Sequence, residues 1–257
     1  MPPAGAGLRK RVMVDHSKPV PKQPEGQAAI DAFLRQVAAA PAPAAAGRGR
    51  LVFALDATAS RQPTWDVARG IQGEMFRVAE QLGGLAVQLV FYRGLRECLA
   101  TPFLASAAEL QRRMAKVECL GGQTQLARIL SHTLKQTARQ KVAALVFVGD
   151  AFEEDLDHAC ALAGELGIAG VPAFLFHEGG DPVARRAFEQ IARLSGGACC
   201  PFDPGSAQQL RELLGAVAAY AAGGRPALAR YGEGRSAPVL QLIRQLGPPR
   251  PVADGPA

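Results

Sequence analysis

Short apolar runs alternate with helical patterns through the middle of this chain, and the alternation restricts the fold more than any other feature. The runs are apolar along most of their length and cover residues 51–55, 85–92, 142–148, 171–176 and 198–202. Strands that are apolar on both faces need helices on both sides, as in a parallel sheet. We therefore expect an α/β fold with a doubly wound, mostly parallel central sheet flanked by helices.

Helices are expected in the intervals between these strands. Apolar residues recur every three or four positions most clearly in residues 65–82, and Gly83-Gly84 ends that pattern. Further helices are predicted over residues 107–117, 125–139, 156–166, 182–194 and 207–221. In such open sheets, ligands bind beyond the carboxyl ends of the strands, where the strand order reverses.

The two ends of the chain differ from this middle part in charge and composition. Residues 1–50 carry eight basic and three acidic groups and end in a run of Pro and Ala, and residues 225–257 carry five basic and two acidic groups. Such segments bury little apolar area and are typical of linkers. We expect a basic N-terminal extension (1–49), a folded domain (50–223) and a basic C-terminal extension (224–257). The apolar spacing predicts one short helix in each extension, over residues 27–37 and 239–246.

Composition excludes several classes of protein. Of 257 residues, 48% are hydrophobic and 20% are charged, which is near the globular average, and no apolar run reaches the ~18 residues of a membrane span. No secretory signal is visible, and five cysteines are an odd number, so we expect reduced thiols and a cytoplasmic location. The basic residues form no dense block, so nucleic acid is not an expected partner.

Three oxygen-bearing side chains follow the first predicted strand in the sequence Asp56-Ala57-Thr58-Ala59-Ser60. At alternate positions of a tight loop between strand and helix, they can converge on one point. Hydroxyl and carboxylate oxygens are hard ligands that suit Mg²⁺ or Mn²⁺. The alternative is that Thr58 or Ser60 only caps the next helix.

Two more segments place oxygen atoms at the same edge of the sheet. Gly121-Gly122-Gln123-Thr124 lies between two helical patterns, where glycine lets the backbone turn and a hydroxyl project. Asp150 directly follows the strand that ends at Val148-Gly149. In chain order, Asp56-x-Thr58-x-Ser60, Gly122-x-Thr124 and Asp150 resemble the metal-ion-dependent adhesion site (MIDAS) of the von Willebrand factor A-domain family.

The resemblance extends over roughly residues 50–222, because Ser195-Gly196-Gly197 and the last predicted helix are similar to the end of such domains. It implies an intracellular, bacterial-type member of the family. Thr58 and Ser60 would bind the metal directly, Asp56 would hold them, and Thr124 and Asp150 would act directly or through water. The implied ion is Mg²⁺, with Mn²⁺ or Ca²⁺ as alternatives.

The same resemblance implies a function without catalysis. One coordination position of the metal would be left for a carboxylate of a partner protein, so the module would serve in a larger assembly as a component or scaffold. The sequence departs from the family pattern at Thr58, where Ser is commoner, and at Leu126, where many relatives carry a second hydroxyl.

Two other hypotheses explain parts of the pattern. Asp56-x-Thr58-x-Ser60 and Gly149-Asp150 also resemble the loops of haloacid dehalogenase-like Mg²⁺-dependent phosphotransferases, with Asp56 as nucleophile. That class commonly has a second carboxylate where Thr58 stands, and Lys116, Lys135 and Lys141 do not match its lysine. The third hypothesis keeps the fold and leaves the site without metal.

An acidic run follows Asp150 and comprises Glu153, Glu154, Asp155 and Asp157. Such a run favours the solvated start of a helix, where negative charge interacts well with the helix dipole. The alternative is an acidic rim that attracts cations to the site.

Overall fold

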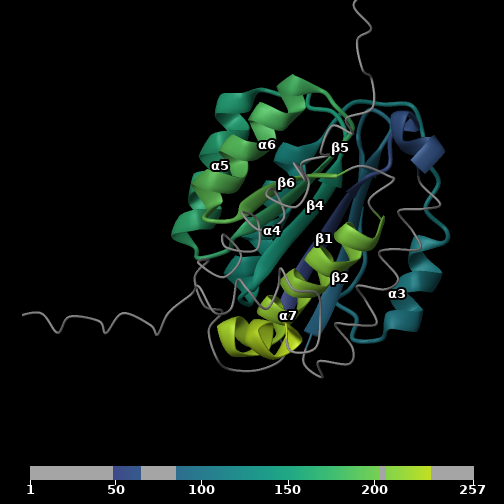
Figure 1. Cartoon of the computed structure of the whole chain (residues 1–257). Coiled ribbons are helices and arrows are strands. Elements are labelled where there is room, and N and C mark those ends of the chain that lie inside the picture. The colour runs from purple at the N-terminus through teal and green to yellow at the C-terminus, as the bar shows by residue number, and fades with distance from the viewer. Residues whose placement is uncertain (1–48, 65–84, 203–206, 233–257) are drawn as a thin grey trace, which may run out of the picture.

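The computed structural model describes residues 49–64, 85–202 and 207–232. Within them the expected strands and helices form a single sheet with helices on both of its faces (Figure 1). The helices expected over residues 27–37, 65–82 and 239–246 lie outside the described residues.

The sheet confirms the predicted fold class. In the described residues its strands are β1 (Gly49–Asp56), β2 (Leu85–Arg93), β3 (Glu97–Ala100), β4 (Ala144–Gly149), β5 (Ala173–Glu178) and β6 (Ala198–Phe202), in the order β3-β2-β1-β4-β5-β6. All neighbouring pairs are parallel except β2 and β3, which are antiparallel. The short edge strand β3 was not expected from the sequence. The chain therefore places β2 on one side of β1 and β4 on the other.

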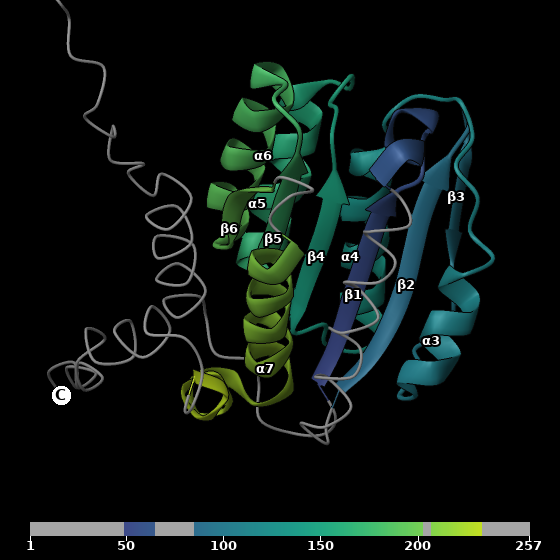
Figure 2. The same ribbon diagram turned by 45° about the vertical axis from the view of Figure 1, so that its right-hand side comes forward.

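The helices are divided between the two faces of the sheet. Those in the described residues are the 3₁₀ helix η1 (Ala59–Thr64), α3 (Ala107–Met114), α4 (Leu126–Arg139), α5 (Leu156–Ile168), α6 (Pro182–Ser195) and α7 (Ala207–Gly232). Helices α3 and α7 pack on one face, and α4, α5 and α6 pack on the other (Figure 2).

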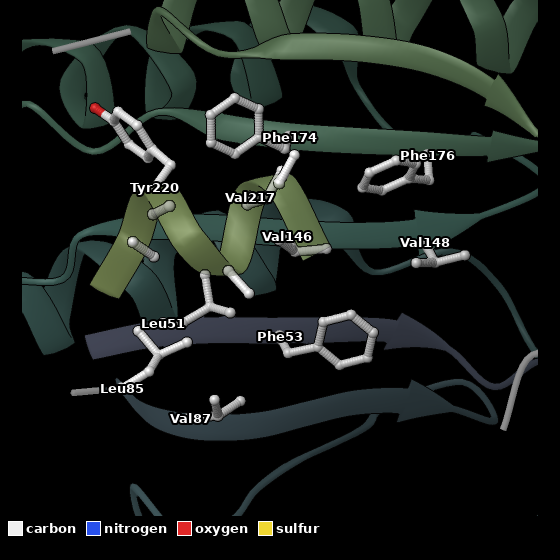
Figure 3. Close-up of a cluster of buried hydrophobic side chains, with 14 of the residues drawn as sticks. Leu51, Phe53, Leu85, Val87, Val146, Val148, Phe174, Phe176, Val217 and Tyr220 are labelled. Carbon is white, nitrogen blue, oxygen red and sulfur yellow. The ribbon is translucent and has the colours of Figure 1, made fainter. Parts of the chain in front are cut away.

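Alternate residues of each central strand belong to different cores. In β1, Leu51 and Phe53 face α3 and α7, whereas Val52 and Ala54 face the other three helices. Figure 3 shows the first core, which includes Leu51 and Phe53 of β1 and in which Val217 of α7 lies close to Phe174 and Val146. Burying each such large side chain contributes about 1.5–3 kcal/mol, so the central strands form a rigid support for the loops that follow them.

Two helix ends differ from expectation by three residues or more. Helix α3 ends at Met114 rather than at residue 117, and the amides of Lys116 and Val117 bond to the carbonyls of Arg113 and Met114 in a tighter turn. Helix α7 continues to Gly232 past a kink at Gly223 and Gly224, both of which have non-helical backbone angles. Beyond the kink, Leu228 and Tyr231 pack into the core. Among the described helices, none has the length and apolar character needed to cross a membrane.

Candidate metal centre

The predicted site lies at the point where the strand order reverses. Asp56 is the last residue of β1, and Asp150 follows Gly149 at the end of the parallel neighbour β4. From β1 the chain first adds β2 on one side and later adds β4 on the other. The carboxyl ends of β1 and β4 therefore lie at the position where open α/β sheets commonly bind their ligands.

The carboxylate of Asp56 is fully buried and is hydrogen-bonded through both of its oxygens. The backbone N–H of Thr58 donates to Oδ1 at 2.7 Å, and the hydroxyl of Tyr92 donates to Oδ2 at 2.8 Å. Burial raises the pKa of Asp56 above its ordinary value, the bonds from Thr58 and Tyr92 oppose that rise, and the charge of Asp150 adds to it. Asp56 thus shapes the loop that carries Thr58 and Ser60.

The hydroxyls of Thr58 and Ser60 meet at the surface of this loop. Thr58 Oγ1 and Ser60 Oγ are 3.0 Å apart and share a hydrogen bond, and Ser60 is exposed. Two neighbouring ligands of an octahedral Mg²⁺ ion, each at ~2.0–2.1 Å and at right angles, are ~2.9 Å apart. The pair therefore has the spacing that two adjacent ligands of such an ion require.

The segment that carries Thr124 runs alongside the Asp56 loop. The N–H of Leu120 donates to the carbonyl of Ala57 at 3.0 Å. Gly122 lies so close to Gly94 that a β-carbon on Gly122 would come within 2.0 Å of the Gly94 carbonyl oxygen. Glycine is needed here because any side chain would push the segment away from β2 and the Asp56 loop.

Thr124 is connected to the Asp150 loop through Glu153. Its Oγ1 accepts a hydrogen bond from the N–H of Glu153 at 2.9 Å, and its own N–H donates to Glu153 Oε2 at 3.4 Å. The threonine hydroxyl retains a lone pair for a further interaction. Two predicted site residues, Thr124 and Asp150, are therefore held on segments that are bonded to each other.

Asp150 provides the test of whether a cation fits. Its Oδ1 is buried and has no hydrogen-bond partner in the part of the chain that the structure describes. A buried carboxylate oxygen without a partner is costly, and a cation beside it would remove that cost. Like the Thr58 and Ser60 hydroxyls, this carboxylate is an oxygen donor of the hard type that Mg²⁺ prefers, so the predicted residues fit such an ion by their chemistry.

The comparisons with known proteins concern the fold. No family model matches the sequence, and a search of curated proteins finds no match. Among solved structures, a von Willebrand factor type A protein from Catenulispora acidiphila aligns with a TM-score of 0.54 and 18% identity over 69% of this chain and 44% of that one. The chain has the von Willebrand factor A fold.

Two further structures with this fold are relevant. Proximal thread matrix protein 1 from the mussel byssus, with a zinc-occupied MIDAS motif, aligns with a TM-score of 0.52 and 14% identity over 67% of this chain and 46% of that one. The pilus adhesin SpaC from Lactobacillus rhamnosus GG aligns with a TM-score of 0.56 and 9% identity over 75% of this chain and 31% of that one. This chain thus spans less than half the length of each of these proteins.

The described part of the chain has no cluster of the usual metal-binding side chains. Within the described residues, no group of three or more His, Cys, Asp and Glu side chains is placed to hold an ion. Any ion at the predicted site would therefore depend on the hydroxyls of Thr58, Ser60 and Thr124. The acidic run after Asp150 is used for capping: Glu154 accepts from the N–H groups of Leu126 and Ala127 at the start of α4.

The other two residues of the acidic run, Asp155 and Asp157, lie at the start of α5. Asp155 accepts from the N–H groups of Asp157 and His158 and so caps α5, as the helix-start interpretation predicts. Glu153 and Glu154, by contrast, bond to the segment around Thr124 rather than forming a free acidic rim.

Sequence reasoning missed three side chains that bond to or near the Asp56 loop: Tyr92, Arg61 and Glu178. Tyr92 stands opposite Asp56 in the parallel register of β1 and β2, and that register could have identified it. Arg61 directly follows Ser60, and its guanidinium bonds to Glu178 at the end of β5. No sequence signal links Arg61 to Glu178, because their proximity depends on the strand order.

The phosphotransferase hypothesis needs a lysine close to Asp56, and Lys141 lies elsewhere. Lys141 Nζ donates to the carbonyl of Gly170 at 2.8 Å and also bonds to that of Ala169. Both contacts lie before β4 and β5, at the amino ends of the strands and away from Asp56. Lys141 is therefore not placed to stabilise a phosphoryl group on Asp56.

Proposed function

We propose that this A-domain fold is a metal-dependent protein-interaction module without catalytic activity. A divalent ion, Mg²⁺ or alternatively Mn²⁺ or Ca²⁺, would bind at the site formed by Asp56, Thr58, Ser60, Thr124 and Asp150. The observation that carries the proposal is the pair of hydroxyls 3.0 Å apart, Thr58 Oγ1 and Ser60 Oγ, on the loop after β1. It is joined by the buried Oδ1 of Asp150, at the end of the neighbouring strand β4, which has no hydrogen-bond partner among the described residues.

The charge balance of the site explains what a bound ion would do. Asp56 uses both carboxylate oxygens to accept hydrogen bonds from Thr58 and Tyr92. The direct ligands would then be mainly neutral hydroxyls, which leave most of the charge of the ion uncompensated. Such an ion attracts an external carboxylate, and Ser60 is exposed, so a partner can reach this part of the loop. The partner would therefore be a protein that presents an acidic side chain.

The similar structures support this proposal by their descriptions. The mussel byssus protein has a MIDAS motif that holds zinc, and SpaC is a pilus adhesin. Both have the fold of this chain with a TM-score above 0.5. An adhesion site that uses a metal is therefore compatible with the same arrangement of strands and loops.

We also propose the predicted division of the chain into extensions (1–49 and 224–257) around one domain (50–223). The role would be that of a cytoplasmic component or scaffold of a larger assembly. The five cysteines are free thiols in the structure. The kink of α7 at Gly223 and Gly224 falls at the proposed boundary, although the packed part of the chain continues to Tyr231.

Thermal unfolding with and without metal tests the proposal. A ligand at about 100 times its Kd stabilises the native state by about 2.7 kcal/mol, which corresponds to a rise in Tm on the order of 5–10 °C for a domain of this size. Thr58→Val removes the hydroxyl at nearly constant volume and should abolish the Mg²⁺-dependent rise. Thr58→Ser keeps the hydroxyl and should retain it.

The test also separates the other hypotheses. If wild type shows no rise in Tm with Mg²⁺, Mn²⁺ or Ca²⁺, the fold has no metal at this site. If wild type hydrolyses phosphoesters and Asp56→Asn abolishes the turnover, the phosphotransferase hypothesis is correct. A protein that is captured from lysate in Mg²⁺ by wild type, but neither in chelator nor by Thr124→Ala, would be the expected partner.

A further inference from the structure

Arg61 is a buried arginine that connects the loop over residues 56–60, called the metal loop below, to strand β5. It directly follows Ser60 in η1, and its side chain is 0% exposed. Nη1 donates to the backbone carbonyl of Asp56 at 3.0 Å, and Nε donates to Glu178 Oε2 at 3.0 Å. Nη2 bonds to the same carboxylate oxygen. One guanidinium therefore holds both the start of the metal loop and the end of β5.

This contact joins two strands, β1 and β5, that are not neighbours in the sheet. Glu178 is the last residue of β5, and β4 lies between β5 and β1 in the sheet. The N–H of Arg61 also donates to the carbonyl of Thr58 at 3.2 Å. The backbone of the loop is thus fixed at Asp56 and at Thr58 by a residue whose side chain is anchored two strands away.

A buried ion pair of this kind is not explained by stability alone. Replacing such a pair by apolar residues is often neutral or stabilising, whereas removing one partner is strongly destabilising. Here the arginine also donates a hydrogen bond to the backbone carbonyl of Asp56, at the start of the loop that carries the Thr58 and Ser60 hydroxyls. We infer that Arg61 and Glu178 are positioning residues, which hold the Asp56–Ser60 loop in its ligating arrangement before a metal arrives.

This inference rests on the proposed metal site. It predicts an effect of Arg61→Met on metal affinity opposite to the effect expected from charge repulsion alone. If the charge of Arg61 only repelled the ion, Arg61→Met would strengthen metal binding. If Arg61 positions the loop, the same substitution weakens binding, because the carbonyl of Asp56 loses its anchor. Substitutions of partners that orient metal ligands typically weaken metal affinity about 10–100-fold.

The experiment measures Mn²⁺ binding to the full chain by isothermal titration calorimetry. The main variant is Arg61→Met/Glu178→Leu, which removes the pair without leaving a buried charge. It should remain folded by circular dichroism and bind Mn²⁺ about 10–100-fold more weakly than wild type. Arg61→Lys keeps the charge but cannot reach both partners with a planar fork, so it should also weaken binding.

A matched control comes from an ion pair that is far from the site. Arg185→Met/Glu189→Leu removes an exposed pair on α6, in which Nε and Oε1 are 2.9 Å apart, and should leave the Kd for Mn²⁺ unchanged. Wild-type affinity in folded Arg61→Met/Glu178→Leu and in Arg61→Lys would overturn the inference while the proposed function stands. Tighter binding by Arg61→Met would also overturn it. No Mn²⁺ binding by wild type would overturn the proposed function and this inference together.

Discussion

The carboxylate of Asp56 shows at the scale of single residues how the loop is arranged. Each of its oxygens accepts one short hydrogen bond, from Thr58 N–H and from Tyr92 O–H. Burial raises the pKa of Tyr92 well above its usual range, and the neighbouring Asp56 charge raises it further. The phenol therefore stays protonated and remains a donor over the whole physiological pH range.

Removal of this donor gives the first prediction. Tyr92→Phe leaves Asp56 Oδ2 buried without its partner, which should lower the free energy of unfolding by about 1–3 kcal/mol. The loop should also hold metal less well. Urea unfolding in chelator measures the first effect, and Mg²⁺ titration measures the second. A variant with wild-type stability and wild-type affinity would show that Tyr92 does not support the loop.

A second prediction concerns pH and is independent of the metal. His132 on α4 donates from Nε2 to Gln88 Oε1 at 2.8 Å, and the Gln88 amide is fixed by its own bond to Thr101 O. Burial lowers the pKa of His132 below its usual value, and the charges of Lys135 and Arg139 lower it further. The unfolded chain therefore takes up this proton first as the pH falls through 6.5.

The folded state should lose stability as the pH falls from about 6.5 through the lowered pKa of His132. His132→Gln should make the free energy of unfolding less dependent on pH in this window. His158→Gln, at an exposed position of α5, is the control and should leave the slope as in wild type. Urea unfolding at several pH values gives the slopes. Equal slopes for wild type and His132→Gln would contradict the prediction.

At the scale of secondary-structure elements, the start of helix α4 is capped by a carboxylate from the loop that precedes α5. Its N-cap residue, Gln125, makes no side-chain capping bond. Glu154 instead accepts from the amides of Leu126 and Ala127, and the latter bond is 2.9 Å long. Glu153 also bonds to Thr124, both as donor and as acceptor, so hydrogen bonds join the start of α4 to the Asp150 loop.

This arrangement predicts two effects of Glu154→Ala. The loss of the cap should lower the free energy of unfolding by about 0.5–2 kcal/mol, and the loosened segment around Thr124 should weaken metal binding. Asp155→Ala removes the cap of α5 and should lower stability by a similar amount, but leave metal binding unchanged. Hydrogen exchange of the Leu126 and Ala127 amides reports the loss directly. Equal metal affinity in the two variants would contradict the link to Thr124.

The same elements show how much the sequence can predict. Strands such as β1 and β4 were predictable because both of their faces are apolar. β3 has only four residues, none of them fully buried, so its pattern does not differ from that of a loop. The end of α7 was missed because Gly223 and Gly224 are typical of a helix end, whereas Leu228 and Tyr231 still reach the core.

The site was partly predictable for a related reason. Asp56, Thr58 and Ser60 are close in sequence, so their spacing alone suggests a common target. Tyr92 and Glu178 come from other strands, and only the order and register of the sheet bring them beneath the loop. Glu154 was interpreted as part of a solvated helix start, and its use as a cap for α4 depends on the packing of two loops.

At the scale of the whole molecule, the sheet brings distant segments to one edge. The Asp56 loop and the Asp150 loop follow the carboxyl ends of the neighbouring strands β1 and β4, and the Thr124 segment is bonded to both loops. The Arg61–Glu178 pair ties this edge of the sheet to β5. Residues 51–224 carry 16 basic and 18 acidic groups, so this part is slightly acidic, whereas both ends are basic. The site is thus a property of the fold rather than of one motif.

The most direct test of the metal site is a count of bound Mn²⁺ by electron paramagnetic resonance, since only free Mn²⁺ gives the sharp signal. Wild type and Thr58→Ser should each bind about one ion per chain, and added Mg²⁺ should displace it. Thr58→Val should leave the Mn²⁺ free at the same concentrations. If wild type leaves all Mn²⁺ free, or Thr58→Val binds as much as wild type, the oxygens of these three loops do not hold a metal.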